Sequence, residues 1–261
     1  MDNRYVTLSV LFGISIIVGT FFIFQLQFEE RTSFDEDLTR TNFPGFSIDE
    51  QNPIKVGILH SLTGTMAISE HPVMESTMLA IDEINQQGGL LGRKIVPIIV
   101  DGESDLQTFE KQAEYLIEEE KVSAVFGGWT SASRKTMLPV FEKYDHALFY
   151  PVQYEGLESS KNIIYTGAAP NQQVIPGVEW AFENLGTKFF LVGSDYVFPR
   201  SANEIIKEKI TELGGSVVGE EYRTLGDSNF NSIVQKIKKS VSAPKEQGVE
   251  TMIFWLLDHA L

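Results

Sequence analysis

The sequence predicts an α/β protein with two lobes, each built on a parallel sheet, preceded by one transmembrane helix. Three observations support this prediction. Short hydrophobic runs alternate with helical patterns from Ile54 onward, the alternation restarts after Pro170, and a long uncharged stretch lies near the N-terminus. Strands that are hydrophobic on both faces and separated by helices are typical of a parallel sheet that is covered on both sides.

The uncharged stretch comprises residues 5–28. At about 1.5 Å per residue, a helix of this length crosses a hydrocarbon core of about 30 Å. A secretory signal has a shorter hydrophobic core and a small-residue cleavage site, and neither is evident here. We therefore expect residues 1–28 to be an uncleaved transmembrane signal anchor that leaves the rest of the chain on the extracytoplasmic side.

A polar linker is expected to follow the anchor. Residues 29–53 lack a sustained hydrophobic period and contain Pro44, Gly45 and Pro53, which are typical of irregular segments. We place the linker in residues 29–53 and the start of the folded body at Ile54.

The first lobe is expected to span residues 54–168. Runs rich in β-branched and aromatic residues predict its strands at residues 54–62, 94–100, 122–129, 146–152 and 162–168. Helical patterns lie between them at residues 71–87, 106–121 and 131–144.

A second, partial lobe is expected in residues 169–261. Its predicted strands are residues 188–194, 216–222 and 250–257, and its predicted helices are residues 171–186, 201–215 and 229–241. The joint between the lobes is placed near residues 167–171.

The ends of these strands indicate where a ligand would bind, because ligands of open parallel sheets lie outside the carboxyl ends of the strands. The predicted strands end in polar and aromatic groups, most of them neutral, at residues 61–64, 101, 127–131, 150–154 and 194–196. Hydroxyls, backbone amides and aromatic rings suit a small, uncharged, polar ligand.

Several of these residues also have a purely structural interpretation. Ser131 and Ser133 open a helical pattern and could each be an N-cap instead of a ligand contact. Trp129 and Tyr150 could belong to the core.

The charged residues near the strand ends have structural interpretations too. Ser194 and Asp195 could cap the helix that is predicted after Pro199. Arg134 and Arg200 each enter a helix and are expected to be ion-pair partners.

Composition excludes several functions. A formal net charge of -15 argues against a nucleic-acid partner, because phosphate backbones are bound by basic surfaces. The chain has no Cys and only four His residues, which are scattered without metal-ligand spacing. No pair of a nucleophile and a base is evident, so a hydrolase is the weakest interpretation. We expect no cofactor, no metal site, no catalytic residues and no enzymatic activity.

Several motifs resemble the urea and short-chain amide binding proteins, which are the solute receptors of ABC-type importers. The motifs are VGILHSLTG at residues 56–64, VFGGWTSASRK at 125–135, LFYPVQYEGLE at 148–158 and LVGSDYVFPRSAN at 191–203. The resemblance implies the type I periplasmic binding protein fold, in which two α/β lobes close over the ligand. It also implies that an ABC permease is a partner.

The resemblance implies specific ligand contacts as well. In that family the first lobe contributes a Ser, a Tyr and a Pro backbone, and the second lobe contributes a Tyr. The matching positions and their neighbours are Trp129, Thr130, Ser131, Tyr150, Pro151, Val152 and Tyr196.

Two departures from the family leave an alternative open. Such receptors are normally freed or anchored through a lipid-modified Cys, whereas this chain has an uncharged N-terminal stretch and no Cys. The family also continues beyond the point at which this chain ends, so we expect the second lobe to be truncated. The alternative is the ligand-binding outer domain of a membrane-anchored sensor.

Overall fold

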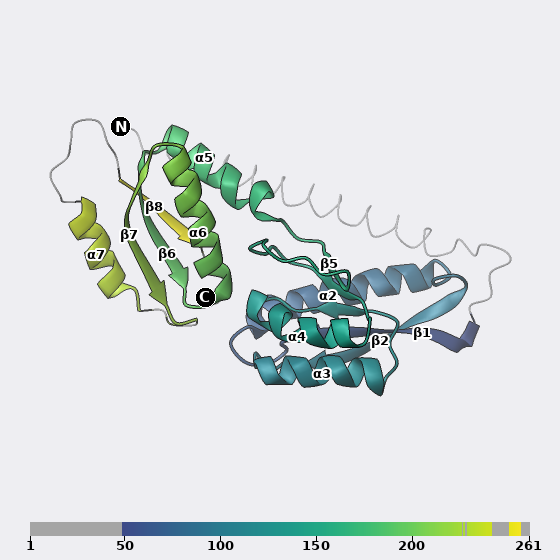
Figure 1. Ribbon diagram of the computed structural model, residues 1–261. Coiled ribbons are helices and arrows are strands. Elements are labelled where there is room, and N and C mark those ends of the chain that lie inside the picture. The colour runs from purple at the N-terminus through teal and green to yellow at the C-terminus, as the bar shows by residue number, and fades with distance from the viewer. Residues whose placement is uncertain (1–48, 226, 228, 242–250, 257–261) are drawn as a thin grey trace, which may run out of the picture. The chain divides into compact units, whose positions relative to one another are not determined.

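The computed structural model describes residues 49–225, 227, 229–241 and 251–256 (Figure 1). The predicted transmembrane segment, residues 5–28, lies outside these ranges. Within them, no helix combines the length and the hydrophobicity that a membrane crossing requires.

The first part of the chain forms a parallel sheet of five strands in the order β2-β1-β3-β4-β5. Its strands are β1 (Asp49–His60), β2 (Arg93–Asp101), β3 (Val125–Gly127), β4 (Leu148–Tyr150) and β5 (Ile163–Tyr165). The helices between them are α2 (Ala67–Gln86), α3 (Leu106–Glu118) and α4 (Ser131–Lys143).

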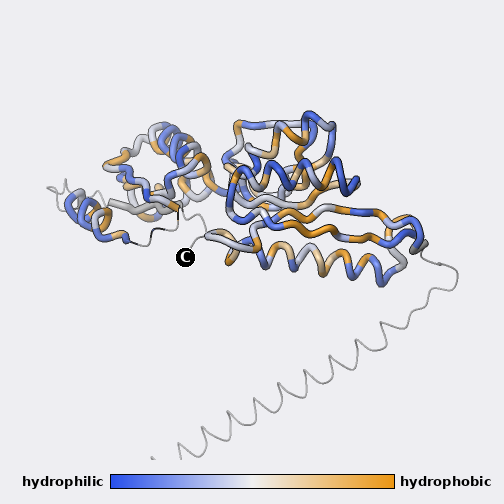
Figure 2. The backbone as a smooth tube through the Cα atoms, turned by 90° about the horizontal axis from the view of Figure 1, so that it is seen from below, coloured by the Kyte–Doolittle hydropathy of each residue, from blue (hydrophilic) through white to orange (hydrophobic). Residues whose placement is uncertain are grey.

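Helices cover both faces of this sheet, with α2 on one face and α3 and α4 on the other (Figure 1). Successive side chains of β1 point to opposite faces of the sheet. Ile58 packs in the same cluster as Ile81 of α2, whereas Leu59 packs with residues of α3 and α4. At Gly57 a Cβ would lie 2.8 Å from a methyl of Leu116, so glycine allows α3 to approach the strand closely. Figure 2 shows the resulting pattern, with hydrophobic residues running along the strands.

A second parallel sheet has the order β7-β6-β8. Its strands are β6 (Lys188–Ser194), β7 (Ser216–Arg223) and β8 (Thr251–Leu256). It is accompanied by the 3₁₀ turn η1 (Pro170–Gln172) and the helices α5 (Val174–Asn184), α6 (Val197–Glu212) and α7 (Asn231–Val241).

The side chains of β6 also pack on both faces of their sheet. Phe189 and Leu191 pack with residues of α5 and α6, whereas Phe190 and Val192 pack with Ile233 of α7. This central strand is therefore hydrophobic throughout, as a strand covered on both faces must be.

The body begins earlier than the sequence indicates. Strand β1 starts at Asp49, so the structure differs from the predicted linker over residues 49–53. The register against β2 shifts between Asp49 and Ile54. Pro53 lies in this interval, and a proline cannot donate to the ladder. Residues 49–53 are also polar or proline, so the early part of the strand has no hydrophobic pattern that would predict it. The predicted boundary between residues 168 and 169 falls in the connection between β5 and η1.

Candidate functional site

A cavity of about 190 Å³ lies at the carboxyl ends of the first strands of the five-stranded sheet. Its lining combines hydroxyls and one carboxylate with hydrophobic side chains. The lining residues are Ser61, Met66, Glu70, Ser104, Leu106, Phe109, Thr130, Ala132, Ser133, Tyr196 and Leu225.

Asp101, at the end of β2, connects the loop after β1 to the loop after β2 by hydrogen bonds. Its carboxylate accepts hydrogen bonds from the backbone N–H of Leu62 at 2.8 Å and of Glu103 at 2.7 Å, and from the hydroxyl of Thr63 at 2.7 Å. Burial acts to raise the pKa of Asp101, but these hydrogen bonds outweigh it and lower the pKa below its usual value. Asp101 is therefore a structural residue of the loops and does not line the cavity.

Glu70 is the one carboxylate among the lining residues. It lies in the first turn of α2 and folds back onto the end of β1, where only 1% of its surface is exposed. Its Oε2 accepts a hydrogen bond from the backbone N–H of Ser61 at 2.9 Å and lies 3.1 Å from Nδ1 of His60, which is equally buried. Glu70 is not among the sequence-predicted contacts; the signal in the sequence is an acidic residue in the helix that follows the first strand.

The third strand end is shaped by two glycines that lead into α4. A Cβ at Gly127 would lie 1.9 Å from the carbonyl oxygen of Leu59, so no larger residue fits beside β1. Thr130 is the N-cap of α4, because its hydroxyl accepts a hydrogen bond from the backbone N–H of Ser133 at 3.0 Å. Thr130 and Ser133 both line the cavity, and the cap is neither of the two serines that the sequence suggested.

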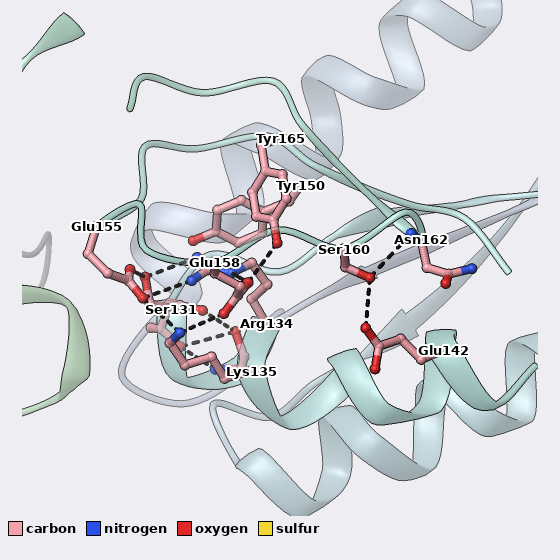
Figure 3. A network of polar contacts seen from close by, with 12 residues as sticks. Ser131, Arg134, Lys135, Glu142, Tyr150, Glu155, Glu158, Ser160, Asn162 and Tyr165 are labelled. Carbon is pink, nitrogen blue, oxygen red and sulfur yellow. Dashed lines mark hydrogen bonds and ion pairs between the residues drawn. The ribbon is translucent and has the colours of Figure 1, made fainter. Parts of the chain in front are cut away.

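Ser131 is not among the lining residues, and its hydroxyl lies in a buried ionic network (Figure 3). Its hydroxyl donates to Oε2 of Glu155 at 2.5 Å and accepts from the guanidinium of Arg134 at 3.1 Å. Only 2% of Ser131 is exposed.

Arg134 is the centre of that network and is fully buried. It donates to Glu155 at 2.9 Å and to Glu158 at 2.8 Å, while Lys135 contacts the same two carboxylates. The guanidinium also lies 4.7 Å from the ring centroid of Tyr150. Two cations therefore face two carboxylates, and the expectation that Arg134 is an ion-pair partner is confirmed.

Tyr150 belongs to the hydrophobic core and has no exposed surface. Its hydroxyl donates to the backbone carbonyl of Trp129, and burial raises its pKa. The half-buried Pro151 and Val152 follow it, and Val152 packs against the same core. None of these four residues lines the cavity, and the same is true of Ser131. Of the seven predicted contacts, the cavity brings together Thr130 and Tyr196.

Tyr196 is half-buried at the N-cap position of α6, which has no side-chain cap. The interpretation of Asp195 as a cap is therefore wrong. Its carboxylate instead pairs with Arg200 at 2.7 Å, and both side chains are about half exposed, at 49% and 53%. The expectation that Arg200 is an ion-pair partner is confirmed.

Among the described residues, no group of three His, Asp or Glu side chains could hold a metal ion.

The periplasmic binding protein domain family matches residues 54–252, which is more than half of the chain. The chain belongs to this family. The predicted type I periplasmic binding protein fold, with its parallel sheets, is confirmed. A periplasmic binding protein domain implies an extracytoplasmic location.

Related proteins are similar over part of their length. The Leu/Ile/Val-binding protein BraC3 of Rhizobium johnstonii is 23% identical over 192 residues, which cover 71% of this chain and 51% of that protein. This periplasmic binding protein domain thus spans about half the length of the curated relatives it matches.

Two solved structures have a similar fold. One is the branched-chain amino acid transporter substrate binding protein LivJ from Streptococcus pneumoniae in complex with isoleucine, with a TM-score of 0.67, 21% identity and coverage of 78% of this chain and 64% of that chain. The other is a solute binding protein of an ABC transporter from R. palustris in complex with 4-hydroxybenzoate, with a TM-score of 0.67, 24% identity and coverage of 79% and 54%. These likenesses establish the fold and not the ligand.

Proposed function

We propose that this chain is the ligand-binding part of an extracytoplasmic solute receptor that serves an ABC-type importer, and that its ligand is urea or a short-chain aliphatic amide. The observation that carries the proposal is the cavity beside β1 and α4. It is small, and the described residues that line it include hydroxyls but no Lys, Arg or His.

The size of the cavity favours a ligand with few atoms. A cavity of about 150 Å³ can hold benzene, whereas drug-sized ligands occupy pockets of roughly 300–1,000 Å³. A volume of about 190 Å³ therefore suits a molecule of the size of urea, acetamide or propionamide.

The charge of the lining disfavours a ligand that carries a carboxylate. Isoleucine and 4-hydroxybenzoate, the ligands of the two similar structures, each carry a carboxylate. Here such a group would meet no cationic side chain and would face the carboxylate of Glu70. The motifs at residues 125–135, 148–158 and 191–203 support the same ligand class.

Ser131, Tyr150 and the other implied contacts that do not line the cavity keep a supporting role in this proposal. Ser131 positions α4 through Arg134, and the hydroxyl of Tyr150 holds the backbone of Trp129. Thr130 and Tyr196 are proposed as direct contacts. The hydroxyl of Tyr196 can donate to the carbonyl oxygen of an amide.

Isothermal titration calorimetry of the full chain tests the ligand class. Urea, acetamide and propionamide should produce saturable heats, whereas leucine, isoleucine and 4-hydroxybenzoate should not. Binding of leucine or 4-hydroxybenzoate without binding of any amide would overturn the proposal. The protein should release no ammonia from urea or acetamide, because binding and lobe closure require no turnover.

A membrane-anchored sensor is the second candidate, and the uncharged stretch of residues 5–28 in a chain without Cys favours it. In both cases we propose that residues 1–28 anchor the protein. Retention in the membrane fraction after alkaline extraction would support the anchor. Co-purification with an ABC permease would favour transport over sensing.

A further inference from the structure

We propose that Glu70 is a specificity-determining ligand contact, whose carboxylate accepts an N–H hydrogen bond from the bound molecule. This inference rests on the proposed function, because it names the residue that recognises the amide or urea nitrogen. No motif or comparison assigns a role to this residue.

Burial makes Glu70 unusual. Carboxylates are almost never fully buried unless they are paired, because removing the charge from water is costly. Glu70 is 1% exposed and nevertheless lines the cavity. Its Oε2 is occupied by the N–H of Ser61 and by His60. Among the described residues, no group donates a hydrogen bond to Oε1.

The neighbouring polar groups are already paired. The hydroxyl of Ser104 donates to the carbonyl of Thr63 at 2.9 Å and accepts from the N–H of Met66 at 3.0 Å. The hydroxyl of Thr130 donates to that of Ser133 at 3.0 Å, and Ser133 donates in turn to the backbone of Thr130 at 2.9 Å. Oε1 of Glu70 is thus a hydrogen-bond acceptor to which no described group of the protein donates.

An amide nitrogen needs such an acceptor. An N–H group that leaves water for this partly open cavity and finds no partner there loses hydration and gains nothing in return. A hydrogen bond to an ionised acceptor is also stronger than one to a neutral acceptor. Glu70 is therefore placed to distinguish ligands that carry N–H groups from ligands of the same shape that lack them.

Urea, acetamide and acetone form an isosteric series for testing this role, because successive NH₂ groups are replaced by CH₃. Calorimetry on the full chain should show that acetamide binds at least tenfold more tightly than acetone. Equal affinities of the unaltered protein for acetamide and acetone would overturn the inference without the need for any variant.

Glu70→Gln tests the residue itself. Glutamine has the same shape, and its oxygen can still accept from Ser61, but its NH₂ group would then face the ligand as a donor. We expect the preference for acetamide over acetone to disappear in this variant. A purely structural role would lower stability and leave the preference intact, which is the result that would refute the inference while the proposed function stands.

Asp101→Asn is the matched control. Asp101 is also a carboxylate that accepts backbone N–H groups at a strand end, but it does not line the cavity. Its loss should lower the unfolding temperature and leave the acetamide preference unchanged. If the unaltered protein binds neither urea nor acetamide, the proposed function and this inference both fail.

Discussion

The guanidinium of Arg134 lies 2.9 Å from the carboxylate of Glu155, and neither side chain is more than 2% exposed. The two residues connect the first turn of α4 to the segment that follows β4 (Figure 3). This segment has little regular structure, so the ionic contacts contribute to its position together with the hydrogen bond from the N–H of Tyr154 to the carbonyl of Ala168 at 3.1 Å.

Replacing Arg134 should therefore destabilise the fold strongly. Arg134→Met leaves two buried carboxylates without their main partner, and breaking a buried pair typically costs about 3–5 kcal/mol. Thermal or guanidinium unfolding measures the loss. Arg200→Met is the matched control, because the Arg200–Asp195 pair is exposed and such pairs contribute about 0–1 kcal/mol. Similar losses in both variants would contradict the structural role of the network.

Acidification should weaken the same network. Burial opposes ionisation of Glu158, but hydrogen bonds from Arg134, Lys135 and Tyr165 outweigh it and lower its pKa from 4.5 to about 2. A lowered folded-state pKa means that the stabilisation is present above about pH 4.5 and is lost as the pH falls toward about 2. The stability difference between the unaltered protein and Glu158→Gln should shrink over this interval. A constant difference from pH 6 to about pH 2 would show that Glu158 does not titrate in this way.

Ser131 is expected to affect stability because of its partners. Ser131→Ala removes a donor to Glu155 and an acceptor for Arg134, both of which stay buried. An unmatched buried polar group costs about 1–3 kcal/mol, which chemical denaturation would detect. A loss of amide affinity with unchanged stability would instead place Ser131 in direct contact with the ligand.

Thr130 should act as a helix cap. Thr130→Ala removes the acceptor for the N–H of Ser133 and should cost about 1 kcal/mol of unfolding free energy, whereas Thr130→Ser keeps the hydroxyl and should cost much less. Unfolding curves of the two variants provide the comparison. If they are equally destabilised, the lost methyl group rather than the cap is responsible.

Tyr196 should affect binding more than stability. Tyr196→Phe removes only a hydroxyl, and we expect about a fivefold loss of amide affinity with an unchanged unfolding temperature, since one hydrogen bond is worth roughly 1 kcal/mol. Tyr222→Phe is the control, because that hydroxyl is bonded to Asn203 and Glu220 and does not line the cavity. Lower stability with unchanged affinity in Tyr196→Phe would assign this residue to the core.

Much of the architecture follows from local sequence patterns. Hydrophobic runs such as residues 188–194 predict strands covered on both faces, and the helical patterns between them require parallel strands. The same reasoning locates the ligand outside the carboxyl ends of the strands. Thr130 and Tyr196 lie among the residues after two strand ends, but the family resemblance, and not the strand ends alone, singled them out.

Which side chains face the cavity was decided by the tertiary structure. One step along a helix turns a side chain by about 100°, so Ser131 enters the ionic network while its neighbour Ala132 and then Ser133 line the cavity. Glu70 becomes part of the cavity only because α2 folds back over the end of β1. The partners of Arg134 lie in the segment after β4, beyond any helical or strand period. The sequence by itself determined the strands, helices and strand ends, because their signals are local. The choice of partners depended on packing between distant segments, which no local period encodes.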